Sequence, residues 1–410
     1  MRYTFSIFLI VCLFLAEFSI AGEALAKYVI SGKVIDGESQ EGLPFAHVFL
    51  SGTTYGVATD MEGQFSFEVK EAGTYELMVR FIGFESYAQV IRVDKSNEPV
   101  LTITLKPKTD FLEAVEVVAG KQRNRQELPD GRIIVTGGFL WKQYYRMFLA
   151  NFLGMSPFTD DTKILNADAI EFTIDGANNR FTASTTAPLK IMNKGLGYEL
   201  TYFLENFEAD FNDQSASYHG YPLFKELEPR SRRQARRWDK NRERAYVGSS
   251  RQFFRALYNN RLRRSKFVTR NYAPSQRPMR ASADPELIGG FRKLSEKINM
   301  SRLIGKADDF GVKTFRPAHT VVVTGTWEIE DDEYVRPPEF RYIFGDDDFK
   351  KGDINYQHSW FKLNKPDTGI RIAENGYVFN PLDFRVEGYW VYEKVAALLP
   401  FDYQSKFEKE

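Results

Sequence analysis

The sequence predicts a mainly β protein: a β-sandwich at the front, then a second β-rich domain with a basic helical insertion and a C-terminal helix. Three observations support this fold class. Apolar and polar residues alternate along short runs that are separated by turn residues. Aromatic residues, which suit the pleated surface of a sheet, make up 15% of the chain. One long segment, residues 230–266, instead has helical spacing and is rich in arginine.

Residues 1–26 have the pattern of a secretory signal peptide. Arg2 gives a positive start, residues 5–15 are almost entirely apolar, and Ala24-Leu25-Ala26 fits the small-residue cleavage rule. A membrane-spanning helix needs about 20 apolar residues, so this run is short for an uncleaved anchor, which is the alternative. We expect cleavage after Ala26, with residues 19–21 as the second choice, and export to the periplasm or the outer membrane. The single cysteine, Cys12, would leave with the signal peptide, so we expect no disulfide and no thiol chemistry.

Residues 27–107 have the alternation of a β-sandwich, with one buried and one exposed face along each strand. The alternating runs are residues 28–34, 46–50, 65–69, 75–81 and 101–105. They are separated by Asp36-Gly37, Gly42-Leu43-Pro44, residues 60–63 and Gly83. These residues tolerate or fix the backbone angles that turns require.

The same stretch resembles a known family of accessory modules. The motifs that carry the resemblance are Gly32-Lys33-Val34, Gly42-Leu43-Pro44-Phe45-Ala46, Gly52-Thr53, Thr59-Asp60 with Gly63 and Phe65, and Gly83-Phe84-Glu85. Together they resemble the carboxypeptidase-regulatory-like domain, over about residues 28–106. The resemblance implies a transthyretin-like sandwich and a non-catalytic module found on peptidases and envelope proteins. It implies no substrate.

Residues 108–135 are interpreted as a linker with one short strand, residues 114–118. The sequence LKPKTDFLEAVEVVAGK, residues 105–121, resembles the junction between this module and the plug of TonB-dependent outer-membrane receptors. The chain departs from those receptors because its remaining residues lack their long series of alternating strands.

Residues 136–410 are predicted to form a second α+β domain. Leu140, Tyr144, Phe148 and Phe152 recur at four-residue spacing and predict a helix over residues 139–152. Strands are expected at residues 169–174, 180–185, 189–192, 198–211, 320–329, 340–344, 358–363 and 369–373, and a final helix at 388–399. The insertion, residues 230–266, is expected to form two helices, with Ser249 or Ser250 capping the second. This half resembles the C-terminal part of uncharacterised envelope proteins that carry the same front module, and the resemblance implies no activity.

The sequence offers no recognisable catalytic or metal site. None of His47, His219, His319 and His358 has a glutamate three residues later, as a zinc carboxypeptidase would require. There is no G-x-S-x-G motif and no glycine-rich phosphate loop. Acidic clusters occur at residues 331–333 and at 346–348 with Asp353, but Lys350 stands where a calcium loop needs a ligand. Asp60, Glu62 and Gly63 form a tighter group, which the chemistry of a hairpin turn explains, with calcium as the alternative at either site. We therefore expect no cofactor, although carboxylates from distant parts of the sequence could pair to cleave a glycan.

The clearest feature is a concentration of positive charge. Residues 230–270 hold 15 lysine or arginine residues against Asp239 and Glu243, a net charge of +13 in a chain of zero formal net charge. One interpretation is a solvated helical pair that meets acidic surface within the fold, such as residues 346–348. The other is a binding site for anionic lipid or acidic glycan. The candidate binding residues are Arg230, Arg232, Arg233, Arg236 and Arg237.

Three functional hypotheses remain. The first is a non-catalytic envelope protein that binds or scaffolds, with an envelope protein, anionic lipid or glycan as partner and no nucleic acid. The second is a glycan- or peptide-cleaving hydrolase with a site in the second domain. The third is an accessory partner of TonB-dependent uptake receptors.

Overall fold

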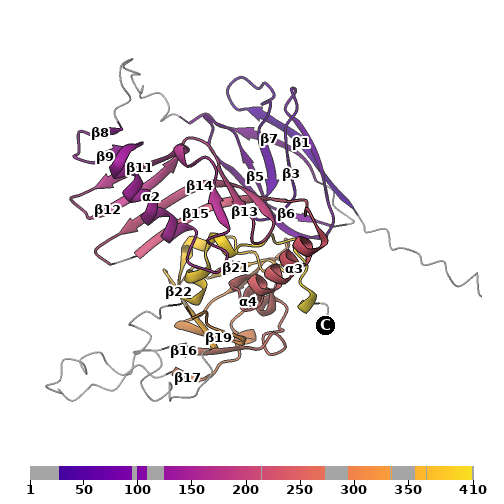
Figure 1. The fold of residues 1–410 in the computed structure, drawn as a ribbon. Coiled ribbons are helices and arrows are strands. Elements are labelled where there is room, and N and C mark those ends of the chain that lie inside the picture. The colour runs from indigo at the N-terminus through magenta and orange to yellow at the C-terminus, as the bar shows by residue number, and fades with distance from the viewer. Residues whose placement is uncertain are drawn as a thin grey trace, which may run out of the picture.

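The computed structural model describes residues 27–94, 99–108, 124–213, 215–272, 294–332, 334, 356–365 and 367–408. The fold is mainly β, as the sequence predicts (Figure 1). The expected signal peptide, the expected strands at 114–118 and 340–344 and the acidic cluster at 346–353 lie outside the described residues. Within the described residues, no helix is both long and apolar enough to cross a membrane.

Residues 27–107 form a β-sandwich, called the sandwich below. Its strands are β1 (Tyr28–Asp36), β2 (His47–Leu50), β3 (Gly56–Ala58), β4 (Gln64–Val69), β5 (Gly73–Arg80), β6 (Tyr87–Val93) and β7 (Val100–Leu105). One sheet has the order β4-β1-β7 and the other β3-β2-β5-β6. Ile30, Val48 and Leu77 are fully buried between the sheets, because alternate side chains of each strand point inward.

The next part of the chain builds a curved sheet. Its order is β10-β13-β14-β12-β11-β9-β8, and β15 pairs with the other edge of β14. The strands are β8 (Arg125–Glu127), β9 (Ile133–Val135), β10 (Thr162–Ile164), β11 (Ile170–Asp175), β12 (Arg180–Thr185), β13 (Leu189–Asn193), β14 (Tyr198–Asp210) and β15 (Ser215–Glu226). β8 and β9 fall inside the expected linker, residues 108–135, so the end of that segment belongs to this sheet.

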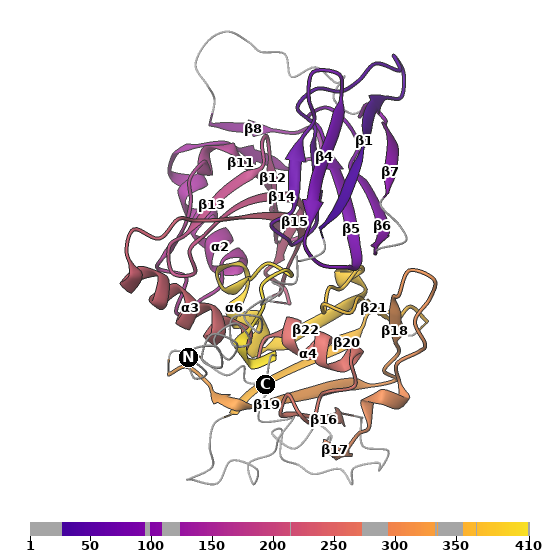
Figure 2. The same ribbon diagram turned by 90° about the vertical axis from the view of Figure 1, so that its right-hand side faces the viewer.

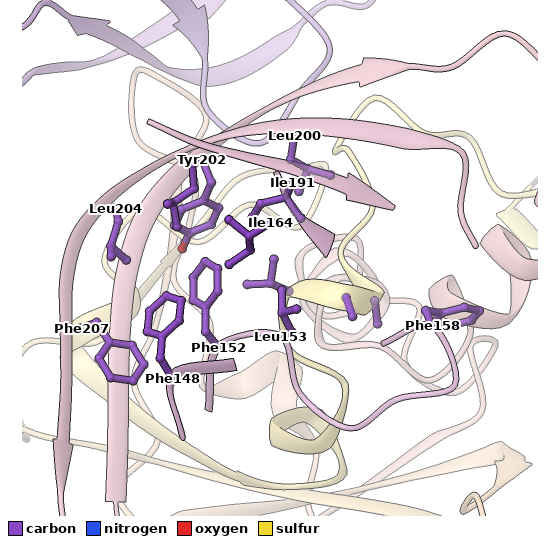
Figure 3. Packing of buried hydrophobic residues seen from close by; sticks show 14 of the residues in the cluster. Phe148, Phe152, Leu153, Phe158, Ile164, Ile191, Leu200, Tyr202, Leu204 and Phe207 are labelled. Atoms are coloured by element: carbon purple, nitrogen blue, oxygen red, sulfur yellow. The ribbon is translucent and has the colours of Figure 1, made fainter. Parts of the chain in front are cut away.

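Helix α2 (Gly138–Phe152) packs on the curved sheet and confirms the helix expected from four-residue spacing. Phe148 and Phe152 stack on each other at 4.8 Å between ring centroids. Figure 3 shows both rings pointing toward Tyr202 and Phe207 of β14. The ring of Phe152 lies 5.0 Å from Tyr202, and that of Phe148 lies 4.7 Å from Phe207. These contacts belong to the hydrophobic core between α2 and the curved sheet.

A second sheet follows, with the order β17-β16-β19-β20-β22. Its strands are β16 (Phe267–Tyr272), β17 (Leu294–Lys297), β19 (Thr320–Ile329), β20 (Tyr356–Leu363) and β22 (Phe384–Gly388), and β18 (Lys313–Phe315) pairs with β21 (Ile370–Ile372) beside it. Helix α4 (Ser250–Tyr258) buries Phe253 and Phe254 against Phe361 of this sheet, as expected for the insertion. Helix α3 (Arg232–Tyr246) precedes α4, and Ser249 caps α4 by accepting the Gln252 N–H at 3.2 Å.

Two helical expectations need correction. The insertion is helical only to Tyr258, because Asn259 caps α4 and Asn260 has a φ of 54°, which no α-helix accommodates. The expected C-terminal helix, residues 388–399, is a short helix α6 (Tyr389–Glu393) and a 3-10 turn (Val395–Ala397). Lys394 between them has a φ of 41°, which interrupts the helix.

The sandwich is joined to the second half by packing and by backbone hydrogen bonds. Phe49 is fully buried and stacks on Phe203 of β14 at 4.9 Å. At the β2–β3 turn, Gly52 donates its N–H to Pro222 at 2.7 Å and accepts the Phe401 N–H at 2.7 Å. Figure 2 shows the yellow C-terminal segment passing beneath the sandwich, where this turn meets it. Gly52 has a φ of 71°, and a Cβ there would lie 2.7 Å from the Phe401 ring, so the turn requires glycine.

Candidate functional site

The candidate site is the solvent side of helix α3, which begins inside a run of arginines. Ser231 caps the helix by accepting the Gln234 N–H at 3.2 Å, and the Gln234 side chain accepts the Arg230 N–H at 2.8 Å. The first bond satisfies a backbone donor that the first turn leaves free, and the second ties the residue before the cap to the helix. The first turn contains no acidic residue to balance the helix dipole.

The inner side of α3 is fixed to the turn between β13 and β14. Trp238 donates its indole N–H to the Lys194 carbonyl at 2.7 Å, and the Asn241 amide donates to Gly195 at 2.8 Å. Arg242 is buried, donates to the Leu196 carbonyl at 2.8 Å and forms an ion pair with Glu226. The guanidinium also lies 4.2 Å above the Tyr198 ring. Carbonyl oxygens, a carboxylate and an aromatic face thus hold this arginine inside the fold.

The end of α3 and the start of α4 hold the C-terminal segment. Glu243 accepts hydrogen bonds from the Tyr403 and Ser405 hydroxyls and from the Lys406 N–H. Burial acts to raise the pKa of Glu243, but these hydrogen bonds outweigh it and lower the pKa. Arg251 is buried and donates to the carbonyls of Pro400, Phe401 and Tyr403 at 2.6, 2.9 and 2.8 Å.

Burial lowers the pKa of Arg251 to about 10, so the side chain is still a cation at neutral pH. Arg244 and Arg255 are paired with Asp331 and Glu408. Part of the positive charge in residues 230–270 therefore serves the fold itself. The ion pairs of Arg244 and Arg255 agree with the first interpretation of the sequence, whereas the burial of Arg242 and Arg251 does not belong to it.

The five candidate arginines are different, because all of them are exposed. With Lys240 they form the basic face: Arg230, Arg232, Arg233, Arg236, Arg237 and Lys240. At 100° per residue, the helical members of this set lie opposite Trp238 and Arg242. Within the described residues, only Arg237 has an acidic partner, Asp161 at 3.9 Å, and its guanidinium also donates to the Lys194 carbonyl at 3.3 Å.

The residues considered for metal or acid–base chemistry are dispersed or engaged in structure. The His47 ring packs on Phe203, the His219 ring packs on Tyr221, and His358 bonds Thr324 at 3.0 Å. The Asp60 side chain accepts hydrogen bonds from the N–H groups of Glu62 and Gln64, as aspartate side chains commonly do in turns. In the described ranges, no three histidine, cysteine or carboxylate side chains gather as a metal site would require.

The inner half of the site was missed by the sequence analysis. A signal was present, because Trp238, Arg242 and Tyr246 recur at four-residue spacing and so share one side of the helix. The carbonyl groups that receive Arg242 come from residues 196 and 197, and no local pattern links those residues to α3.

Comparison with known proteins identifies the front of the chain. Residues 30–118 match the family model of the CarboxypepD_reg-like domain. This match supports the resemblance carried by the glycine and turn motifs of the sandwich. No curated protein matches the chain.

Proposed function

We propose that the chain is an exported, non-catalytic envelope protein that binds or scaffolds, and that the basic face of α3 holds its anionic partner. The observation that carries this proposal is the separation of the two sides of α3. The inner side anchors the helix through Trp238 and Arg242. The outer side presents six exposed cations, and within the described residues only Arg237 among them also contacts the fold, at the Lys194 carbonyl and Asp161.

The electrostatics of the helix support a partner of negative charge. Cations in the first turn oppose the helix dipole, each by about 0.3–1 kcal/mol when exposed. An anion bound against Arg232 and Arg236 would reverse that effect. The expected export would place the chain in the periplasm or at the outer membrane, among anionic lipid head groups and acidic glycans and away from nucleic acid.

The test replaces Arg232, Arg233, Arg236 and Arg237 together with glutamine. Each cation near an anionic surface contributes about 1 kcal/mol, so the variant should lose roughly 4 kcal/mol of binding to phosphatidylglycerol vesicles or to an acidic polysaccharide. Binding by the wild-type chain should fall as salt is raised. The melting temperature should not fall, because the bonds of Trp238 and Arg242 are intact and the removed cations oppose the helix dipole.

A matched control replaces Lys33, Lys70, Lys106 and Lys108 of the sandwich with glutamine, because all four are exposed and the change in net charge is the same. It should bind nearly as the wild type does. A lower melting temperature of the arginine variant, with no binding to lose, would mean that the partner lies within the fold. A wild-type chain that ignores vesicles and polysaccharide at low salt would rule the proposal out.

A further inference from the structure

The turn between α4 and β16 carries a second concentration of positive charge. It holds four exposed cations, called the basic turn below: Arg261, Arg263, Arg264 and Lys266. No acidic residue occurs in residues 259–272. Within the described residues, none of the three arginines forms an ion pair, whereas Arg255 of α4 pairs with Glu408. The basic turn shares no residue with the basic face of α3, so it is a separate surface.

Backbone hydrogen bonds fix the shape of the basic turn. Arg261 donates its N–H to the Ala256 carbonyl of α4 at 2.7 Å and accepts the Ser265 N–H at 2.9 Å. Phe267, the first residue of β16, donates its N–H to Leu262 at 3.0 Å. Ser265 is buried, and Leu262 packs against the core beside α4. The four cations therefore stay close together on the outside of a fixed turn. They repel each other there, and a bound anion would offset that repulsion.

An exposed tryptophan lies against the basic turn. The Trp327 indole N–H donates to the Ser265 carbonyl at 3.0 Å, and the Lys266 ammonium lies 3.6 Å from the centre of the ring. Phe407 packs edge-on against the same ring at 4.5 Å. Trp327 is nevertheless 37% exposed, and Ile329, two residues further along β19, is 59% exposed. Apolar surface and positive charge thus lie next to each other.

The acidic side chains described at the end of β19 and after it leave this surface positive. Glu330 is buried, Asp331 pairs with Arg244 of α3, and Asp332 is exposed. In the described part of this surface, one exposed carboxylate therefore stands against four cations. Figure 2 shows α4, β16 and β19 together at the lower end of the molecule, with the sandwich at the opposite end.

We propose that the basic turn, Trp327 and Ile329 form a contact site for a membrane surface with anionic phosphate head groups. Guanidinium groups donate paired hydrogen bonds to phosphate oxygens, and each cation near an anionic surface adds to binding. Tryptophan rings are enriched where head groups meet acyl chains, and Ile329 adds apolar area beside the ring. A free phosphate or an acidic glycan would use the cations but would leave this apolar surface exposed to water. The combination of the two therefore favours lipid.

The test follows the fluorescence of Trp327 as phosphatidylglycerol vesicles are added to the full exported chain. Entry of the ring into the head-group boundary should shift its emission to shorter wavelength, and lipids brominated on their acyl chains should quench it. The chain has five tryptophans, so the part of the signal that Trp327→Phe removes is the part that belongs to this site. Raised salt should weaken vesicle binding.

A triple glutamine variant tests the cations. It should bind the vesicles roughly a hundredfold more weakly, because three charges leave the contact, and its melting temperature should not fall. A matched control with the same change in net charge lies on the sandwich, at the opposite end of the molecule, and should bind as the wild type does. The triple variant replaces Arg261, Arg263 and Arg264, and the control replaces Lys33, Lys70 and Lys106.

Two comparison ligands separate lipid from other sources of phosphate. Uncharged phosphatidylcholine vesicles and inorganic phosphate should both leave the Trp327 emission unchanged. A shift with inorganic phosphate alone would identify a phosphate site and overturn the proposal. Equal vesicle binding by the triple variant and the wild type would overturn it, as would an emission shift that Trp327→Phe retains in full. Glutamine at the basic face of α3 should leave the Trp327 shift in place at saturating lipid, so the two sites are tested independently.

Discussion

Replacing Phe203 with alanine should weaken the packing between the sandwich and the second half. Phe203 is 3% exposed and belongs to β14, but its ring stacks on Phe49 of the sandwich and packs with Met78. Truncation of a buried phenylalanine typically costs 3–5 kcal/mol. We expect Phe203→Ala to lower the free energy of unfolding by about that amount, measured by urea denaturation with circular dichroism.

A double-mutant cycle with Phe49→Ala isolates the contact itself. Phe49 is buried outside the sandwich's own core cluster and packs with Phe203 instead. The two substitutions should be non-additive by about 0.5–1.5 kcal/mol, the usual contribution of an aromatic pair beyond area burial. Phe139→Ala is the control, because Phe139 is 86% exposed, and it should change stability by less than about 0.5 kcal/mol. Additive losses, or a Phe203→Ala loss under about 1 kcal/mol, would refute the reasoning.

Two further substitutions test the local packing. Gly197→Ala should lower the free energy of unfolding by about 1–3 kcal/mol in urea denaturation. The reason is that Gly197 has a φ of 75° and a Cβ there would lie 2.4 Å from the Trp238 ring. An unchanged free energy of unfolding would show that this turn does not hold α3. Burial raises the pKa of Glu76 despite a hydrogen bond from Tyr377, so the ionised carboxylate opposes folding once pH exceeds its unfolded value of about 4.5. Glu76→Gln should therefore raise the melting temperature at pH 7 and lose that advantage below pH 4.5; an equal effect at both pH values would contradict this assignment.

The elements that the sequence predicts correctly are those whose pattern is local. Residues 180–185 alternate and form β12 over the same span. The four-residue spacing in 139–152 forms α2, and Ser249 caps α4. In each case the hydrophobic period or the capping side chain acts within a few residues, so one sequence contains the whole signal.

The elements that sequence analysis misses depend on partners far along the chain. β15 carries Gly220 and Pro222, residues that argue against the interior of a strand. The strand tolerates Pro222 because it lies at the edge of its sheet, where the carbonyl of Pro222 accepts the Gly52 N–H from the sandwich. No pattern within residues 215–226 predicts that contact.

The sequence alone cannot separate the buried arginines of residues 230–270 from the exposed ones, again because their partners lie far along the chain. Arg242 and Arg251 are buried because carbonyls at residues 196–197 and 400–403 receive them. Arg232 and Arg236 have sequence neighbours of the same kind as those two arginines, yet they face solvent. Removing the carbonyl partners of a buried arginine leaves an uncompensated charge inside the fold, so changes to these contacts lower the stability of the fold. An exposed arginine on an already anchored helix contributes little to folding, so its loss acts on whatever the basic face binds.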